Sequence, residues 1–436
     1  MPGVLSSWPE WQEYEHQYDH IPKDPDFAAA KQAIVSEYGE EALRESWLRV
    51  CEDLKAITDE ISDKRSGIIP VLDTDSILDH GFTDAEASEI RRVGCFIARR
   101  TIPASTVDKA YQDLRQYVAD NRERVQGWPK ETPSMLMLYD SPTQIALRTH
   151  DRQLRLQRRL NALWHDGSSD VATEPLLYSD GVRDRPPGQA FLGLGPHIDA
   201  GSLCRWACPQ YRMAYAEILS GMPENHDAFD LQVRRNAQQT LFPGTAHSKV
   251  FRSFQGWTAL TRAAASEGAI MLYPNVKAAI AYVMLRPFFA PPMDADEVMD
   301  ASKWTFDRNG AFFPGTTKPD SQRLSRISHP HLRLEECLVH IPDMAAGDTV
   351  WWHTDVCHAV DPEHRGRENA SVAYIAACPT TDVNKSYIKE QLEATLSGRP
   401  PPDYASGLEL DERSFIGYTG HVGVSEQAKA ALGYYL

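Results

Sequence analysis

The stretch LGPHIDAGSLCRW (194–206) joins the end of an apolar run to two side chains that can bind metals. On an extended strand, residues two apart point to the same face, so His197 and Asp199 would project together. Gly-Pro precedes them and Gly201-Ser202 follows, which predicts that they lie at a strand end, where a barrel opens. An imidazole and a carboxylate placed in this way can bind one divalent metal ion.

A single His-x-Asp is weak evidence for a metal site, because the chain contains a second one, His353-Thr354-Asp355. It lies within AGDTVWWHTDVCHAV (346–360), where a Gly-Asp turn begins an apolar strand. His358 lies further along this stretch, so we expect it nearer the opening and favour it as the third ligand. His353 is the alternative third ligand. It could instead have a structural role in which its ring is hydrogen-bonded.

Two histidines and one carboxylate on one side of a metal ion leave coordination positions open. This is the ligand set of non-heme iron(II) oxygenases. We therefore predict that His197, Asp199 and His358 hold Fe(II) and form the catalytic centre. 2-Oxoglutarate and O2 are the co-substrates expected at the open positions.

The far carboxylate of 2-oxoglutarate requires a fixed cation inside the barrel, and a planar guanidinium grips a carboxylate at two points. Arg365 and Arg367 follow His358 closely and precede the apolar run SVAYIAACP (371–379). We predict Arg367 as the partner of this carboxylate, with Arg365 as a close alternative. Ser371 would add a hydroxyl.

Further side chains are predicted to line the substrate pocket. They are Arg148, Gln144, Arg205, Trp206, Gln255 and Trp257. Gln255 and Trp257 alternate on one expected strand and so share a face, although a packed core position is an equally good interpretation for either tryptophan. Arg148, Arg183, Arg185 and Arg205 are each able to meet a carboxylate, which favours a small polar metabolite, such as an amino acid, as the substrate.

Composition limits the classes of function. The formal net charge of the 436-residue chain is −16, whereas nucleic-acid binders carry basic stripes that displace counterions from phosphates. The sequence has no apolar run of about 18 residues, the length that a membrane span needs. Its seven cysteines are scattered and odd in number, which is typical of free thiols in a reducing compartment. We therefore expect a cytoplasmic protein without a nucleic-acid or membrane partner; its oligomeric state is not readable from the sequence.

The chain divides into two expected regions. Residues 1–82 show apolar steps of three and four residues and are predicted to form a helical extension packed on the core. Residues 83–436 are the predicted catalytic domain, with a helical insertion at about 207–245 and a lid-like loop at about 290–330. Thr83 is the expected N-cap of a short helix.

Short apolar runs separated by turns predict the strands of the second region. They lie at 94–102, 191–199, 254–260, 269–274, 281–289, 337–342, 348–354 and 371–379. Repeated short strands without crossover helices indicate a mainly β fold with helical additions, an antiparallel barrel or jelly roll.

These residues, in this order, resemble the Fe(II)/2-oxoglutarate-dependent dioxygenase superfamily. More narrowly, the chain resembles the YbiU-like family of bacterial and fungal proteins over roughly residues 85–420. The motifs that carry the resemblance are LYDSPTQIALR (138–148), LLYSDGVRDRPPG (176–188), LGPHIDAGSLCRW (194–206), VFRSFQGWTAL (250–260) and GDTVWWHTDVCHAV (347–360). The resemblance implies a double-stranded β-helix (cupin-like) core flanked by α-helices, iron on the triad and Arg367 as the co-substrate anchor.

One segment departs from the family pattern. Gly181 stands where an arginine is expected, and Gln189 where an acid is expected. Since this segment precedes the first His-x-Asp, the substrate is free to differ from that of bacterial relatives.

Other functions stay open at this point. A cupin-like isomerase or dioxygenase would use the same barrel with zinc or manganese and without 2-oxoglutarate. A binding protein would keep the histidines and aspartates in structural roles. A hydrolase is disfavoured because the sequence contains no GxSxG motif. Hydroxylation, desaturation and ring closure use the same iron ligands, so the sequence does not choose between them.

Overall fold

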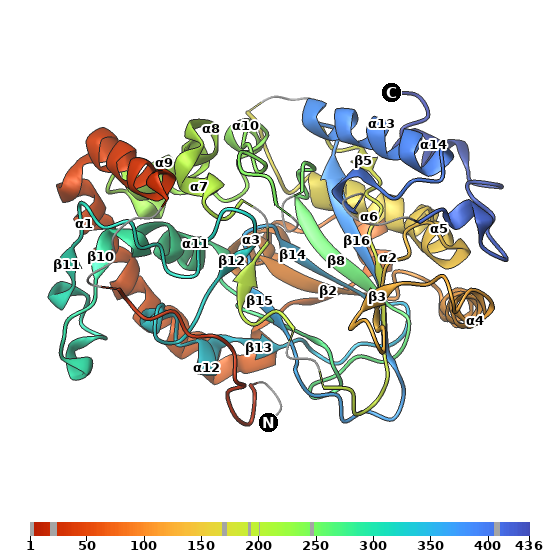
Figure 1. The fold of residues 1–436 in the computed structure, drawn as a ribbon, viewed down its shortest axis with the longest axis horizontal. Helices are drawn as coiled ribbons and strands as arrows, with labels where there is room; N and C mark the ends of the chain where they lie inside the picture. The colour runs from red at the N-terminus through yellow and green to blue at the C-terminus, as the bar shows by residue number, and fades with distance from the viewer. Residues whose placement is uncertain are drawn as a thin grey trace.

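The computed structural model describes residues 4–17, 24–167, 172–190, 193–199, 201–244, 248–404 and 410–436. Its strands lie between two groups of helices (Figure 1). The helices are α1 (Pro25–Lys64), α2 (Thr74–His80), α3 (Asp84–Val93), α4 (Ala104–Asp120), α5 (Pro142–Arg148), α6 (Asp151–Asn161), α7 (Cys204–Ala207), α8 (Pro209–Arg212), α9 (Ala216–Leu219), α10 (Leu231–Arg234), α11 (Val276–Leu285), α12 (Leu334–Cys337), α13 (Asp382–Leu396) and α14 (Glu426–Ala431).

Two sheets carry the architecture. The larger has the order β1 (Val71–Asp73), β2 (Cys95–Arg99), β14 (Thr349–His353), β8 (Phe254–Ala259), β16 (Ala370–Pro379), β6 (Val182–Arg185), β4 (Met135–Leu136), β3 (Gly127–Trp128), with β5 (Pro175–Leu176) on β16. The smaller has the order β12 (Gln322–Arg323), β7 (His197–Ile198), β15 (His358–Val360), β9 (Ile270–Leu272), β13 (Val339–His340). A separate pair joins β10 (Phe289–Ala290) to β11 (Thr305–Phe306). Apart from the parallel pair β1 and β2, the strand pairs in these sheets are antiparallel.

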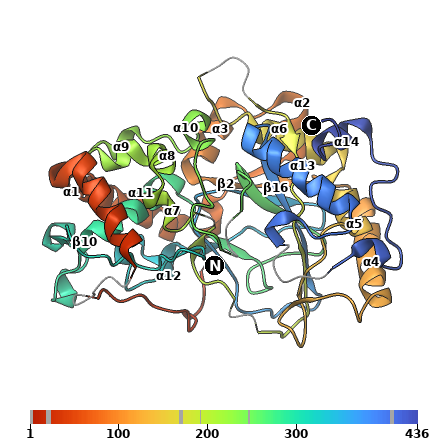
Figure 2. The same ribbon diagram turned by 45° about the horizontal axis from the view of Figure 1, so that its top comes forward.

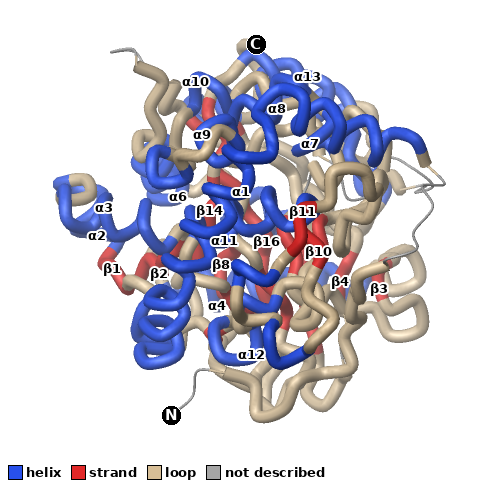
Figure 3. The backbone as a smooth tube through the Cα atoms, turned by 90° about the vertical axis from the view of Figure 1, so that its left-hand side faces the viewer, coloured by secondary structure: helices blue, strands red, loops and turns tan. Residues whose placement is uncertain are grey.

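The fold is mixed α/β, which corrects the predicted mainly β class. The antiparallel sheets are present, but helices α1 to α4 precede most of their strands along the chain. Helices α4, α5, α13 and α14 gather at the end of the molecule opposite α1 (Figure 2). Helix α1 is 40 residues long and bends at Gly39, whose φ of 84° lies outside the helical region. Figure 3 shows α1 and α11 lying over the strands on this side of the molecule.

Most predicted strands are present, but the run at 281–289 is helical. Residues 276–285 form α11, and nearly every side chain of this helix is buried. A helix that is apolar all round shows no 3.6-residue pattern, so a short apolar run of this kind cannot be told from a strand. Thr83 caps α3 in the expected position, and its hydroxyl and Glu86 form a capping box.

An extended N-terminal segment, residues 4–17, packs beside β12 and β7 at one edge of the smaller sheet. Its Tyr14 amide donates to Ser325 Oγ at 3.1 Å, and Glu13 pairs with Arg326 at 2.8 Å. Trp11 lies against Gly195, where an added Cβ would come within 2.8 Å of the indole ring. This segment, which we name the N-terminal strap, therefore packs directly on the approach to β7.

The seven cysteines are buried and unpaired, as expected for free thiols. Among the described residues, no helix has both the length and the apolar character required to cross a membrane.

Candidate metal centre

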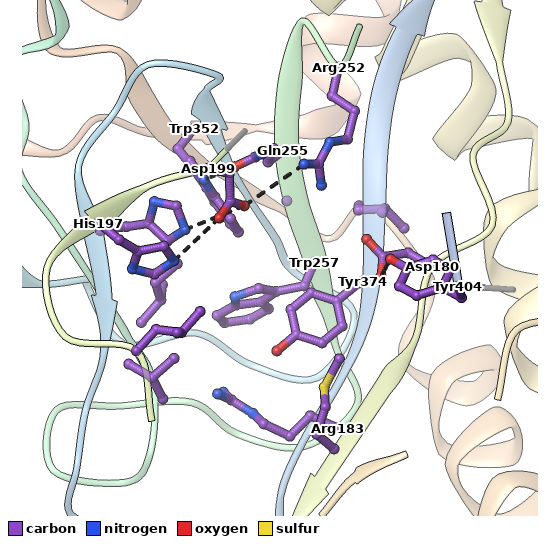
Figure 4. Close-up of a pocket in the computed structure, with 17 residues that line it drawn as sticks. Asp180, Arg183, His197, Asp199, Arg252, Gln255, Trp257, Trp352, Tyr374 and Tyr404 are labelled. Atoms are coloured by element: carbon purple, nitrogen blue, oxygen red, sulfur yellow. Dashed lines mark hydrogen bonds and ion pairs between the residues drawn. The ribbon is translucent and has the colours of Figure 1, made fainter. Parts of the chain in front are cut away.

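The smaller sheet brings together three side chains that could hold a metal ion. Strands β7 and β15 are antiparallel neighbours in which His197 and His358 are direct partners, so their rings lie 4.1 Å apart. Asp199 follows β7 and turns back between them. Its carboxylate oxygens lie 3.4 Å from His197 Nε2 and 3.8 Å from His358 Nε2. One ligand atom from each residue falls within 4.8 Å of the others (Figure 4).

Backbone carbonyls orient both imidazoles. His197 Nδ1 lies 2.8 Å from Gly195 O, and His358 Nδ1 lies 3.0 Å from Val356 O. These contacts place the ring proton on Nδ1 and leave each Nε2 lone pair facing the cavity. Metal-binding histidines are usually held by this kind of hydrogen bond, which fixes both tautomer and ring direction.

The electrostatics favour a cation. Burial, together with the nearby His197 ring, lowers the pKa of His358 to about 3, so its imidazole stays neutral and able to bind a metal. Burial alone would raise the pKa of Asp199. The contacts with His197 and His358 and the positive charge of Arg252 outweigh it, and the pKa of this carboxyl falls well below its usual range. Two imidazole nitrogens and one carboxylate therefore fit a divalent transition metal with open coordination positions.

A cavity of about 230 Å³ begins at these ligands. Strand register explains its wall, because directly opposed residues on antiparallel strands share a face. Trp257 on β8 is paired with Tyr374 on β16, and Arg183 on β6 is paired with Val372, two residues along β16. The same face therefore presents Trp257, Tyr374 and Arg183 to the cavity, as Figure 4 shows.

Arg183 is a buried guanidinium with donors to spare. Its Nη2 donates to Gly268 O at 2.8 Å, whereas its buried Nε has no partner among the described residues. Only 2% of the residue is exposed. An unpaired donor in such surroundings is costly, so the position is suited to an anionic ligand.

The cavity also contains a group that the sequence did not identify. Arg252, just before β8, lies 3.9 Å from the second oxygen of Asp199. Asp180 and Tyr404 line the same wall, and Tyr404 donates its hydroxyl proton to Asp180 Oδ1 at 2.8 Å. Burial raises the pKa of Asp180, and the charge of Arg252 opposes this rise. The available signal was a charged residue, Arg252, in the mostly apolar motif VFRSFQGWTAL (250–260).

The predicted co-substrate anchors lie outside the cavity. Arg365 is 67% exposed and pairs with Glu363 at 2.8 Å, and Arg367 is also exposed. Ser371 is buried, but its hydroxyl lies away from the metal ligands, beside Arg183 and Thr261. The prediction failed because the turn-rich segment after β15 loops out to the surface before β16 begins. Within the described residues, the guanidiniums that line the cavity are Arg183 and Arg252.

The predicted substrate residues divide into two groups. Gln255 and Trp257 line the cavity, and Gln255 Oε1 accepts from Trp352 Nε1 at 2.7 Å. Arg148, Gln144, Arg205 and Trp206 do not. Arg148 is buried against Ser179, Tyr139 and Asp140, and Trp206 is a core residue bonded to Met284 O. Gln144 closes the capping box of α5 and donates to Asp180 O at 2.8 Å, so it reaches the cavity only through Asp180.

Arg205 lies behind the candidate metal centre and holds the main chain at Asp199. It is fully buried, donates to the Asp199 carbonyl at 2.9 Å and lies 3.6 Å from Asp355. Gly201 allows the chain to turn here, because its φ is 70° and an added Cβ would come within 2.6 Å of Tyr211. Arg205 is therefore a positioning residue rather than a pocket residue.

The second His-x-Asp is structural. His353 ends β14 in the larger sheet, its Nε2 lies 2.9 Å from Ala228 O, and its Nδ1 accepts from the Asp355 amide at 3.0 Å. Asp355 is held by two bonds from Arg234, each 2.9 Å long. His358 is not on the same strand, as had been expected, but begins β15 in the smaller sheet after a turn. This change of sheet carries it to His197.

A family model described as Gig2-like matches residues 19–434. The chain belongs to the Gig2-like family. This Gig2-like chain is 29% identical to the YbiU protein of Escherichia coli (strain K12) over 408 residues, which cover 88% of the chain and 91% of the relative. The predicted YbiU-like resemblance is therefore confirmed.

Solved structures of similar proteins extend over nearly the whole Gig2-like chain. The crystal structure of GlcNAc Inducible Gene 2 from Candida albicans has a TM-score of 0.84 at 26% identity, covering 95% of this chain and 90% of that one. A Salmonella typhimurium LT2 protein, whose name provisionally calls it an oxidoreductase, has a TM-score of 0.79 at 25% identity, covering 96% and 99%.

Proposed function

We propose that this Gig2-like protein is a non-heme iron(II) oxygenase that uses 2-oxoglutarate and O2 to oxidise a C–H bond of a small polar metabolite. The observation that carries the proposal is the convergence of His197, Asp199 and His358 at the mouth of a cavity whose wall contains a buried guanidinium. The oxidoreductase name of the Salmonella relative is consistent with it.

The strand order supports a double-stranded β-helix core. Along the chain, β6, β8, β14 and β16 enter the larger sheet, whereas β7, β9, β13 and β15 enter the smaller one. Successive strands therefore mostly alternate between sheets, which is the connectivity of a jelly roll. His197 begins the second of these eight strands and His358 begins the seventh, and the two residues are direct partners in the smaller sheet.

In this proposal Arg183 replaces Arg367 as the partner of the far 2-oxoglutarate carboxylate. Arg183 extends from the interior face of β6 and has free donors beside Tyr374 and Trp257. A carboxylate there would satisfy donors that otherwise stay unpaired in a buried site. This also favours the 2-oxoglutarate enzyme over a cupin-like enzyme without a keto acid, which would leave Arg183 without an anion.

Iron(II) bound at the triad, with 2-oxoglutarate and O2, supplies oxidation of a substrate C–H bond while 2-oxoglutarate is converted to succinate and CO2. The residues of the chain have simpler tasks. Gly195 and Val356 carbonyls keep the two Nε2 atoms directed at the metal, and Asp199 contributes its negative charge. Trp257 and Trp352 exclude water from the inner wall.

The test measures metal, co-substrate and product separately. We expect wild-type protein to bind Fe(II) and 2-oxoglutarate and to release succinate with a panel of metabolites. His197→Ala and His358→Ala should lose iron and succinate formation. Arg183→Met should weaken 2-oxoglutarate binding about thirtyfold or more, because one partner of a buried charge pair is removed.

Arg367→Met is the matched control, since it removes an exposed arginine and should leave 2-oxoglutarate binding unchanged. Normal succinate formation by either histidine variant would refute the iron triad. Activity without 2-oxoglutarate would favour the cupin-like alternative.

A further inference from the structure

The cavity contains two guanidiniums, and 2-oxoglutarate accounts for one. Figure 4 shows Arg252 on the Asp199 side of the cavity, while Arg183 lies beyond Trp257 and Tyr374 on the opposite side. A co-substrate that binds the metal and reaches Arg183 extends away from Arg252. Arg252 is therefore available for a different ligand.

Arg252 has few protein partners. Its side chain is 14% exposed and makes no hydrogen bond to another described residue. Within the described part of the chain, its nearest contacts are the 3.9 Å approach to Asp199 Oδ2 and a position over the Tyr178 ring, 5.6 Å from the centroid. Its charge also acts on Asp180 and Tyr404. A guanidinium stays protonated in proteins and offers five N–H donors. Since Asp199 is expected to bind the metal, most of these donors are left to face the cavity.

A carboxylate stands on the same wall. Asp180 Oδ1 accepts from the Gly181 amide at 2.7 Å and from Tyr404 Oη at 2.8 Å, whereas Oδ2 accepts no bond from a described residue. The Gln144 amide holds the Asp180 main chain, as described above. Asp180 and Arg252 form no ion pair with each other within the described part of the chain. The wall thus offers a fixed anion and a fixed cation, each with free bonding capacity.

We propose that Arg252 and Asp180 form the substrate subsite, and that the substrate is a small molecule with both a carboxylate and an ammonium group, of the α-amino acid class. Arg252 would bind the carboxylate, and Asp180 would accept from the ammonium group. The cavity of about 230 Å³ lies below the usual range for ligand pockets, so only a small substrate fits beside the co-substrate. This inference rests on the proposed function, because it assigns the co-substrate to Arg183.

Placement beside the metal gives the subsite a catalytic consequence. Arg252 lies next to Asp199, so a carboxylate bound there would hold the neighbouring carbon atoms close to the metal. Orienting a substrate in this way is a main contribution of an enzyme to such a reaction. The bond oxidised would then be near the amino acid head group or one or two carbons along its side chain.

The experiment uses full-length protein with Fe(II) and 2-oxoglutarate in the absence of O2, and calorimetry with the twenty common L-amino acids. We expect at least one to bind and its carboxamide to bind at least tenfold more weakly. Arg252→Gln should weaken binding of that amino acid about thirtyfold or more, while the affinity for 2-oxoglutarate stays unchanged. Asp180→Asn should weaken binding of the amino acid but not binding of its N-acetyl derivative. Arg365→Gln, an exposed arginine, is the matched control and should change neither.

Specific outcomes overturn the inference. The inference is wrong if no amino acid in the panel binds, or if an amino acid and its carboxamide bind equally well. It is also wrong if Arg252→Gln loses affinity for 2-oxoglutarate while Arg183→Met keeps it. The last result would make Arg252 the co-substrate anchor. If the wild-type protein binds neither iron nor 2-oxoglutarate, the proposed function is refuted instead. Titration of amino acids into wild type and Arg252→Gln without iron and 2-oxoglutarate would still test whether Arg252 binds the carboxylate.

Discussion

The chain contains His-x-Asp twice, and the two copies have opposite surroundings. At His197 and Asp199, each side chain keeps an atom directed into a cavity, and Asp199 is 25% exposed. At His353 and Asp355, both ring nitrogens have partners and the carboxylate is enclosed by Arg234, Arg205 and Tyr215. The same short motif thus forms a candidate metal site in one place and a structural ion pair in the other.

The difference teaches that free ligand atoms, rather than the motif, define a metal site. His353 stacks on Trp164 with ring centroids 4.9 Å apart and offers no lone pair to an ion. Asp355 instead pairs with Arg205, which in turn holds the main chain at Asp199. Through Arg205, the structural motif at His353 and Asp355 therefore helps to hold the main chain of the candidate metal site at Asp199.

The largest expected effect separates the two aspartates. Asp355→Ala leaves Arg234 and Arg205 buried without their carboxylate, and we expect the free energy of unfolding to fall by about 3–5 kcal/mol. Asp199→Ala is the same chemical change at a partly exposed position, and should cost about 1 kcal/mol or less. Urea unfolding of metal-free protein measures both.

Metal titration of the same two variants completes this comparison. Asp199→Ala should lose metal binding, whereas folded Asp355→Ala should retain a weakened site. Equal stability losses, or metal retention by Asp199→Ala, would contradict the division of roles.

The second prediction concerns pH. Burial is the main cause that lowers the pKa of His353 to about 4, with the charge of Asp355 opposing it and that of Arg234 adding to it. Asp227 also faces this ring. Because the unfolded chain binds the proton more readily, the stability contribution of neutral His353 is complete above pH 6.5. It is lost as the pH falls from about 6.5 to 4, by up to about 3 kcal/mol.

His353→Gln removes this titration while other buried histidines remain. We therefore expect the difference in unfolding free energy between wild type and variant to be larger at pH 7 than at pH 4.5. Urea unfolding at both pH values measures it, and a difference that does not change with pH would show that folding leaves the pKa of His353 at its usual value.

The smallest predicted effect concerns the N-terminal strap. Trp11 covers Gly195, whose carbonyl orients His197. Trp11→Ala should loosen this carbonyl and weaken metal binding about tenfold, as expected for outer contacts of a metal ligand. Trp128→Ala, which removes a half-exposed tryptophan on β3, is the control and should leave metal affinity unchanged. Unchanged affinity in Trp11→Ala would mean that β7 alone fixes His197.

The sequence could predict the parts of the site that depend on local spacing. His197 and Asp199 follow from residues two apart at a strand end, and Gln255 and Trp257 share an inward face for the same reason. The assignment of Arg367 as the co-substrate anchor could not be corrected from the sequence, because the path of the chain between β15 and β16 depends on long-range packing. The buried helix α11 was hidden for a related reason, since a fully apolar segment has no periodic signal.

By itself, the sequence determined the family, the antiparallel strands and a short list of metal ligands, because these depend on residue type and local spacing. Only the tertiary structure decided which His-x-Asp keeps its ligand atoms free, and which arginines face the cavity. Those choices depend on the pairing of β7 with β15 and of β6 with β16, and each pair joins residues more than 150 positions apart in the chain.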